Sequence, residues 1–176
     1  MKICITSASG VEAVTKRELQ KLGYPEVPFV NGRGTLEGDF RDVANLNLRL
    51  ETAGRVEIEL ANFKCDNFDD FFDEILKIEF EKYLDKNAKI IISAKSVMSK
   101  LFALSAIQSL TKKAICNRLE KIYNCRLLED GAEYKIEIAI YKDVVTVLLN
   151  TSGDGLHKRG YRTLVGEAPL KETLAM

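Results

Sequence analysis

The chain has 176 residues, with 26 basic and 26 acidic side chains, so its formal charge is zero, and 46% of its residues are hydrophobic. This composition is typical of an ordinary soluble globular protein. No apolar run approaches the roughly 18 residues that a membrane-spanning helix needs. The N-terminus also lacks the basic-then-apolar order of a signal peptide. We therefore expect a cytoplasmic protein with no membrane partner.

The first 65 residues follow a strand and helix order typical of a ferredoxin-like fold. Residues 2–7 alternate as a strand, and residues 11–22 form an apolar helical stripe. Asn31-Gly32 marks a hairpin, and a second helix follows an acidic cap at Asp39. Residues 55–63 alternate as a strand, which completes a β-α-β-β-α-β order. The inward positions expected on the two helices are Val11, Val14, Leu19, Leu22, Phe40, Val43, Ala44 and Leu50.

A second module of order α-α-β-α-β-β follows and is expected to pack with the first. A phase slip after Leu76 predicts two helices, and the run KIIIS (residues 89–93) predicts a central strand buried on both faces. A helix is predicted over 104–122, followed by two strands over 134–150 joined at Lys142-Asp143. Inward positions are expected at Phe68, Phe71, Phe72, Ile75, Leu76, Phe80, Leu104, Ile107, Ala114, Ile115, Leu119 and Ile122. The four phenylalanines at helical spacing therefore belong to the core and form no stacking platform.

Motifs of catalysis are missing from the sequence. There is no GxGxxG, GxxxxGK[ST], GxSxG or HExxH, and the one histidine, His157, has only Ser152 beside it as a nucleophile. Four cysteines without a paired spacing, together with a single histidine, argue against a structural zinc site. Cys116 carries no sign of a lowered pKa, so we interpret it as inert. We expect no catalytic residue and no metal within this chain.

Basic residues gather in the second half of the chain. Residues 66–90 carry eight acids and four bases, whereas residues 91–176 carry 13 bases and nine acids. Hydroxyl groups beside lysines let a phosphate backbone approach, and a helix N-terminus adds affinity for anions. The candidate phosphate contacts in this segment are Lys95, Ser99, Lys100, Lys112 and Lys113. An ordinary solvated helix face is the alternative, and Arg118 falls in the apolar arc, so it is not a candidate.

The segment HKRGYR (residues 157–162) is the densest basic run. It combines three permanent cations with an imidazole and a phenol, which offer phosphate contacts and stacking surfaces together. Its candidate contacts with nucleic acid are His157, Lys158, Arg159, Tyr161 and Arg162. A solubilising turn after the last strand is the alternative.

The sequence LLNTSGDGLHKRGYRTLVGEAPLKETLA (residues 148–175) resembles a segment of bacterial THUMP-domain methyltransferases. These are the large-subunit rRNA guanine-N2 methyltransferases and their relatives, often labelled N6-adenine-specific DNA methylases. The matching elements are Asn150 to Gly153, Leu156 to Arg162 and Glu167 to Glu172. The resemblance extends over the whole chain and implies an α+β protein with a ferredoxin-like subdomain over 1–65 and a THUMP domain over 66–165. Residues 166–176 would be the truncated start of a methyltransferase domain.

The resemblance implies an RNA-binding module that positions structured RNA, rRNA rather than tRNA, for a methyltransferase domain that uses S-adenosylmethionine. The chain lacks the Asn/Asp-Pro-Pro-Tyr/Phe motif and the glycine-rich loop of such a domain, so we expect no cofactor here. The parent protein would be the enzyme. Lys95, Ser99, Lys100, Lys112 and Lys113 fall where THUMP domains present a basic surface to RNA. The segment 157–162 matches the family run, which either contacts RNA or braces the domain junction.

Two other functions stay open. A THUMP domain can serve another RNA modification, such as thiolation or pseudouridine formation, although the continuation APLKETL argues against it. A ferredoxin-like domain can also act in protein interaction or small-ligand regulation without any role in RNA binding.

Overall fold

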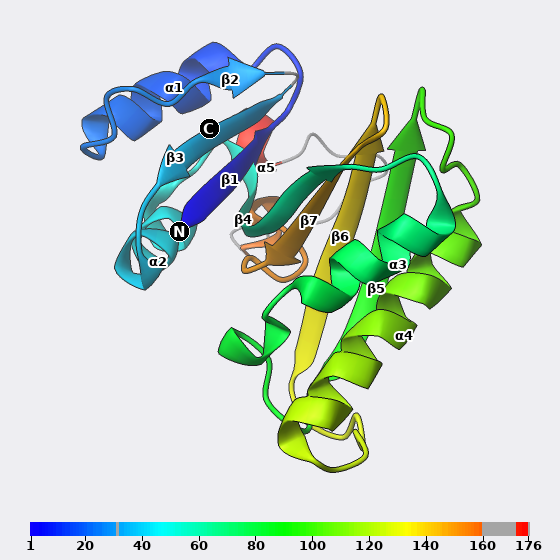
Figure 1. The fold of residues 1–176 in the computed structure, drawn as a ribbon. Coiled ribbons are helices and arrows are strands. Elements are labelled where there is room, and N and C mark those ends of the chain that lie inside the picture. The colour runs from blue at the N-terminus through cyan, green and yellow to red at the C-terminus, as the bar shows by residue number, and fades with distance from the viewer. Residues whose placement is uncertain (31, 160–171, 176) are drawn as a thin grey trace, which may run out of the picture. The chain divides into compact units, whose positions relative to one another are not determined.

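The computed structural model describes residues 1–30, 32–159 and 172–175 of a mixed α/β protein (Figure 1). Its contacts divide the chain into two units, one of residues 1–58 with 150–176 and one of residues 59–149. We call these the first and the second unit. The predicted domain boundaries at residues 65 and 165 stay a prediction.

The first unit contains a sheet of order β2-β3-β1-β4. Its strands are β1 (Lys2–Ser7), β2 (Phe29–Val30), β3 (Arg33–Glu37) and β4 (Ala53–Lys64), the last of which continues into the second unit. β1 pairs antiparallel with β3, with Cys4 opposite Thr35, and β2 pairs antiparallel with β3 as predicted, although Asn31 of the predicted turn lies outside the described residues. This is the strand order expected for the ferredoxin-like pattern.

Two helices, α1 (Glu12–Lys21) and α2 (Phe40–Arg49), connect these strands. The predicted acidic cap of α2 is present: Asp39 Oδ1 accepts hydrogen bonds from the amides of Arg41 (2.7 Å) and Asp42 (3.1 Å). Asp42 Oδ2 in turn accepts one from the amide of Asp39 (2.8 Å), which completes a capping box. The start of α2 is therefore encoded by four consecutive residues.

The inward faces of α1 and α2 differ from the prediction at three positions. Val14 is 48% exposed and Phe40 is 59% exposed, and Ala44 is exposed as well, whereas Thr15 and Leu46 are buried. The hydroxyl of Thr15 is hydrogen-bonded to those of Ser7 and Thr52, both at 2.9 Å. Because its polar atom is satisfied, a threonine takes the buried place that apolar patterning assigned to a valine.

The second unit contains a sheet of order β4-β7-β6-β5, in which β5 runs parallel to β6 and β6 antiparallel to β7. The new strands are β5 (Lys89–Val97), β6 (Glu133–Tyr141) and β7 (Val144–Asn150). Helix α3 (Phe68–Lys77), the one-turn helix η1 (Phe80–Lys82) and helix α4 (Leu104–Tyr123) cover one face of this sheet (Figure 1). The short elements η2 (Leu156–Lys158) and α5 (Glu172–Ala175) belong to the first unit.

The predicted aromatic core of the second unit is confirmed at its centre. Phe71 and Phe80 are fully buried, and Phe68 and Phe72 are half-buried. On α4 the two outermost inward positions were wrong, because Leu104 and Ile122 at the helix ends are 42% and 51% exposed. The apolar face of α4 instead includes Thr111, whose hydroxyl donates to the carbonyl of Ile107 at 2.7 Å.

The prediction that β5 is a central strand was wrong. β5 stands last in the strand order, and its burial alternates: Ile90 is buried and Ile91 is 38% exposed. A continuous apolar run suits a strand covered on both faces, but here the helices cover only one face. The run KIIIS therefore encodes strand propensity without encoding a central place in the sheet.

The predicted hairpin at Lys142-Asp143 is present between β6 and β7. Both residues have positive φ, 50° and 61°, as the two central residues of a type I′ turn require. This turn carries Asp143 to the loop that joins β5 to α4.

Candidate nucleic-acid interface

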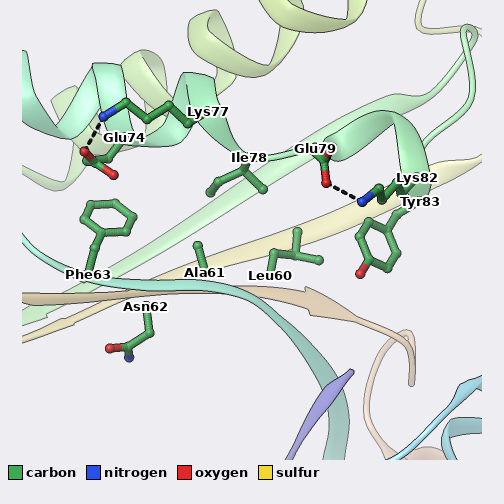
Figure 2. Close-up of a pocket in the computed structure, with 10 residues that line it drawn as sticks. All are labelled: Leu60, Ala61, Asn62, Phe63, Glu74, Lys77, Ile78, Glu79, Lys82 and Tyr83. Carbon is green, nitrogen blue, oxygen red and sulfur yellow. Dashed lines mark hydrogen bonds and ion pairs between the residues drawn. The ribbon is translucent and has the colours of Figure 1, made fainter.

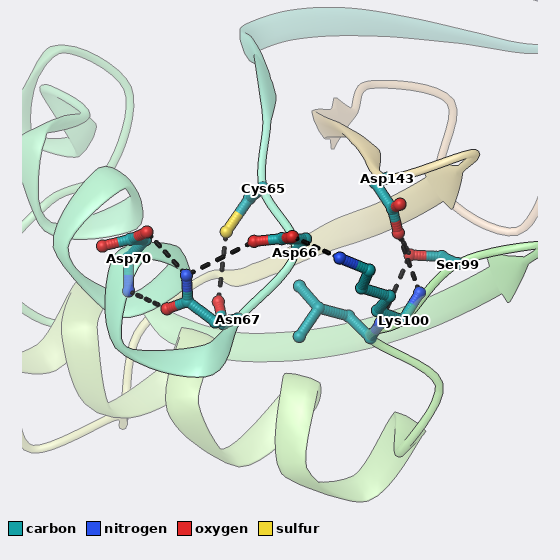
Figure 3. Close-up of polar contacts among 8 residues, drawn as sticks. Cys65, Asp66, Asn67, Asp70, Ser99, Lys100 and Asp143 are labelled. Atoms are coloured by element: carbon teal, nitrogen blue, oxygen red, sulfur yellow. Dashed lines mark hydrogen bonds and ion pairs between the residues drawn. The ribbon is translucent and has the colours of Figure 1, made fainter.

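The loop between β5 and α4 holds two predicted contacts, Ser99 and Lys100, and is fixed by Asp143 (Figure 3). The Ser99 hydroxyl donates to Asp143 Oδ1 at 2.7 Å, and the amide of Lys100 donates to the same oxygen at 2.8 Å. These two donors hold the pKa of the Asp143 carboxyl below its usual range. Ser99 is therefore a scaffold residue whose hydroxyl is engaged within the protein.

Three of the four lysines predicted in the second unit form ion pairs. Lys100 Nζ lies 2.6 Å from Asp66 Oδ2, which raises the pKa of Lys100 and lowers that of Asp66 (Figure 3). Lys95 Nζ lies 2.9 Å from Glu137, whose side chain is 7% exposed. Lys112 Nζ lies 2.7 Å from Glu129. A phosphate group must compete with these carboxylates for the lysine ammonium groups.

Lys113 differs from these three lysines. Its Nζ lies 6.0 Å from the ring centroid of Phe72, at the outer limit of a cation–π contact. Among the residues that the structure describes, this ammonium group has no carboxylate partner. Helix α4, which carries Lys112 and Lys113, begins after Ala103 with no side-chain cap and no acid in its first turn. The uncapped start of α4 and the ammonium group of Lys113 together give this helix a positive potential at its start and along its exposed side.

Two exposed apolar residues beside Lys100 were not predicted. Met98 is 74% exposed and has a φ of 52°, and Phe102 is 77% exposed, while Leu101 between them is buried. The loop is thus held so that Met98 and Phe102 face solvent. The sequence carries a signal for them, since SVMSKLF (residues 96–102) places large apolar residues within a polar loop.

Arg159, in the basic run 157–162, is engaged within the first unit. Its guanidinium donates to the carbonyls of Asn47 (2.8 Å), Leu48 (3.0 Å) and Leu50 (2.5 Å), at the C-terminal end of α2. Those carbonyls lack partners within the helix, and a cation there complements the helix dipole. Arg159 therefore has the contacts of a structural brace.

The other residues of this run are placed differently. His157 is half-buried on η2 and packs against Gly155, whose φ is +110° and whose added Cβ would lie 3.1 Å from the imidazole. Lys158 is exposed, with its Nζ 3.9 Å from a carboxylate oxygen of Asp154. Tyr161 and Arg162 lie outside the described residues.

The turn that precedes this run is tied into the first unit by side-chain hydrogen bonds. The Thr151 hydroxyl donates to the carbonyl of Val56 at 2.7 Å, and Ser152 Oγ accepts from the amide of Val56 at 2.8 Å and donates to Asn47 Oδ1. The Ser152 hydroxyl is thus engaged within the protein. The sequence motif Asn150-Thr151-Ser152-Gly153 is explained by this packing.

Further features of the described residues concern metal binding, membrane spanning, cavities and thiol reactivity. No cluster of three metal-ligating side chains occurs among them, and no described helix is long and apolar enough to cross a membrane. A hollow of about 480 Å³ lies between β4 and the α3–η1 segment, where Glu74 pairs with Lys77 and Glu79 pairs with Lys82 (Figure 2). Burial raises the pKa of the Cys116 thiol, which disfavours the reactive thiolate.

Two family models match the chain. The model of the RlmL ferredoxin-like domain matches residues 2–57, and the THUMP domain model matches residues 65–150. YpsC of Bacillus subtilis strain 168, named as a candidate RNA methyltransferase, is 41% identical over 173 residues, which are 97% of this chain and 45% of YpsC. The ribosomal RNA large subunit methyltransferase K/L of Marinomonas strain MWYL1 is 29% identical over 97% of this chain and 24% of its own length.

Solved structures that superpose on this chain are also described as methylases or methyltransferases. A protein of Listeria monocytogenes described as a predicted N6-adenine-specific DNA methylase superposes with a TM-score of 0.93 at 43% identity, over 99% of this chain and 46% of that one. SMU.472, a candidate methyltransferase complexed with SAH, superposes with a TM-score of 0.91 at 37% identity, over 99% and 46%. The chain thus spans less than half the length of these proteins. It contains an RlmL-type ferredoxin-like domain followed by a THUMP domain, and the sequence relatives that share both regions are named as RNA methyltransferases.

Proposed function

We propose that this chain positions structured RNA, in particular 23S rRNA, for a methyltransferase domain of the same polypeptide. One observation carries the proposal: both domains align in order, over 97% of the chain, with a ribosomal RNA large subunit methyltransferase. A THUMP domain in such relatives supports a role in RNA binding. Large-subunit rRNA as the target, and the methyltransferase domain in cis, go beyond that role and rest on the name of the relative.

The methyl donor of the parent enzyme would be S-adenosylmethionine, as the SAH complex of SMU.472 suggests for that protein. The residues of this chain do not fit this cofactor. The sequence has no glycine-rich nucleotide loop, and the two carboxylates in the hollow of Figure 2 are paired with lysines. The chain's own contribution to the reaction would be to bind and orient the RNA.

The proposed RNA contacts are the α4 lysines, Lys112 and Lys113, and the Phe102 ring at the entrance to α4. Lysines at a helix face supply phosphate contacts, and an exposed ring offers a surface on which an unpaired base stacks. Lys95 and Lys100 contribute once they leave their carboxylate partners. Lys158, which is exposed in the first unit, remains a candidate phosphate contact.

The ion pair Lys112–Glu129 allows a test in which changes to its two residues should alter the affinity for RNA in opposite directions. Binding of the full chain to 23S rRNA fragments and to tRNA is measured by fluorescence anisotropy over a range of salt concentrations. We expect Lys112→Ala to weaken binding and to make the salt slope shallower by about one unit. Glu129→Gln frees Lys112, so we expect it to strengthen binding by about two- to fivefold.

The control for net charge is Glu74→Gln, which removes a carboxylate from the ion pair with Lys77 on α3. Its effect on affinity should be smaller than that of Glu129→Gln. Absence of salt-dependent RNA binding by the wild-type chain would refute the proposed function. Equal effects of the two Glu→Gln changes would refute the place of Lys112 in the interface.

A further inference from the structure

The first unit has a groove of about 710 Å³ between α1 and the C-terminal end of α2, which we call the α1–α2 groove. Its charged lining residues are Arg17, Lys21, Arg49, Arg159, Glu18 and Glu51. Four cations therefore face two carboxylates, which leaves a net charge of +2 in one hollow. None of these residues was a candidate site in the sequence except Arg159.

Three of the four cations have no ion-pair or hydrogen-bond partner among the described residues. Arg17, Lys21 and Arg49 are exposed, and no carboxylate or carbonyl holds any of them within the part of the chain that the structure describes. The lysines of the second unit differ, because Lys95 and Lys112 are each held by a glutamate. An anion can neutralise the groove cations without first breaking an ion pair.

One of the two carboxylates of the groove is engaged within the protein. Glu18 is directed to the protein: its oxygens accept hydrogen bonds from the amide of Glu51 (2.5 Å) and from the amide and hydroxyl of Thr52 (3.2 Å and 2.7 Å). Arg159 covers the carbonyls that end α2, which removes the negative end of that helix from the groove. Glu51 is the remaining carboxylate that faces an incoming ligand.

The groove also has an apolar part. Val14 is 48% exposed and Leu48 is 76% exposed, and both line the groove beside the cations. Unpaired cations beside exposed apolar side chains suit a polymer in which anionic groups alternate with carbon-rich sugars. This pattern matches a nucleic-acid backbone better than it matches an isolated inorganic anion.

We infer that the α1–α2 groove binds the phosphodiester backbone of RNA through Arg17, Lys21 and Arg49, as a second contact surface on the ferredoxin-like domain. This inference rests on the proposed function, since it needs RNA as the ligand. It adds a site that the basic segments of the sequence did not indicate. The role of the groove is to fix the register of the RNA, because phosphate contacts carry position and little sequence information.

A matched pair of double variants tests the inference in the full chain. Lys21→Ala with Arg49→Ala removes one groove cation from each helix, and Lys16→Ala with Arg41→Ala removes one exposed cation from each helix outside the groove. The probe is a structured RNA stem-loop, and its affinity is measured by anisotropy as a function of salt. We expect the groove pair to reduce the salt slope by about two units and to weaken binding at least about tenfold at low salt. The control pair should change the slope by less than half a unit.

Urea unfolding of each variant checks the fold, and Arg17→Ala gives a second groove variant outside the last turn of either helix. A shared loss of slope in the two groove variants, with both folded, supports the inference. Equal salt slopes for the groove double variant and the control double variant overturn the inference. The groove would then suit an acidic protein surface as its ligand. A wild-type chain that binds no RNA overturns the proposed function, and the inference fails with it.

Discussion

Arg159 illustrates how a single side chain can combine a basic character with a structural role. Its guanidinium binds three carbonyls at the end of α2, none of which has a partner within the helix. We expect Arg159→Ala to lower the free energy of unfolding by about 2 kcal/mol, because charged hydrogen bonds are lost and the two part-buried carbonyls of Asn47 and Leu50 are left unpaired. Lys158→Ala is the matched control, and its effect should stay within about 0.5 kcal/mol. Urea denaturation measures both, and equal effects would contradict the structural role of Arg159.

The ion pair between Arg118 and Glu81 predicts a pH dependence of stability. The two side chains are about one-fifth exposed, and Arg118 also donates to the carbonyls of Leu76 and Lys77, at 3.0 and 3.2 Å. The hydrogen bonds from Arg118 lower the pKa of Glu81 in the folded state. A lowered pKa means that the stabilisation is present above the unfolded pKa, about 4.3, and is lost as the pH falls through the folded pKa.

We therefore expect Arg118→Ala to destabilise the chain by about 2 kcal/mol at pH 7, with a smaller loss below about pH 4. The part that persists in acid comes from the two carbonyl contacts, which do not titrate. Arg126→Ala, at an exposed arginine, serves as control and should cost less than about 0.5 kcal/mol at either pH. A loss for Arg118→Ala that is constant from pH 7 to pH 3 would show that the carboxylate contributes nothing.

At the scale of elements, local signals predicted the helices, strands and turns better than their burial. Asp39 begins α2 through its own carboxylate, and Lys142-Asp143 forms its turn through the left-handed backbone of both residues, as expected. The place of a strand in its sheet depends on partners far along the chain, so KIIIS was assigned to the centre although β5 lies at the end of the strand order. Thr15 and Thr111 are buried because hydroxyl partners and carbonyls satisfy them, which apolar periodicity does not encode.

The hairpin between β6 and β7 stores backbone strain that a substitution can release. Lys142 has a φ of 50°, and a left-handed conformation costs a residue with a Cβ roughly 1–2 kcal/mol. We expect Lys142→Gly to stabilise the chain by about 0.5–1 kcal/mol, after the larger entropy of glycine in the unfolded chain is subtracted. Lys142→Ala keeps the Cβ and isolates the loss of the Lys142 side chain, whose Nζ lies 5.3 Å from the Tyr141 ring centroid. Chemical denaturation would contradict this account if the free energy of unfolding of Lys142→Gly were equal to or below that of Lys142→Ala.

At the scale of the whole molecule, the sequence shows which residues are basic but not which basic side chains are held in ion pairs. Lys95, Lys100 and Lys112 are paired with carboxylates 42, 34 and 17 residues away, and only the tertiary fold brings these partners together. Arg17, Lys21 and Arg49 are dispersed over two helices of a segment with balanced charge, so composition gave no sign of the α1–α2 groove. The resemblance rests on motifs such as Asn150 to Gly153, whose side chains form hydrogen bonds within the first unit.

Binding of one RNA by both units has a thermodynamic signature. If a single RNA contacts the α1–α2 groove and Lys112, the variants Lys21→Ala with Arg49→Ala and Lys112→Ala should have additive effects on the binding free energy, within about 0.5 kcal/mol. The combined variant should then lose about three units of salt slope, with one RNA bound per chain. If each unit bound its own RNA, titration calorimetry would find two RNAs per wild-type chain. Loss of one surface would then abolish one binding event and leave the slope of the other unchanged, which would contradict a shared ligand.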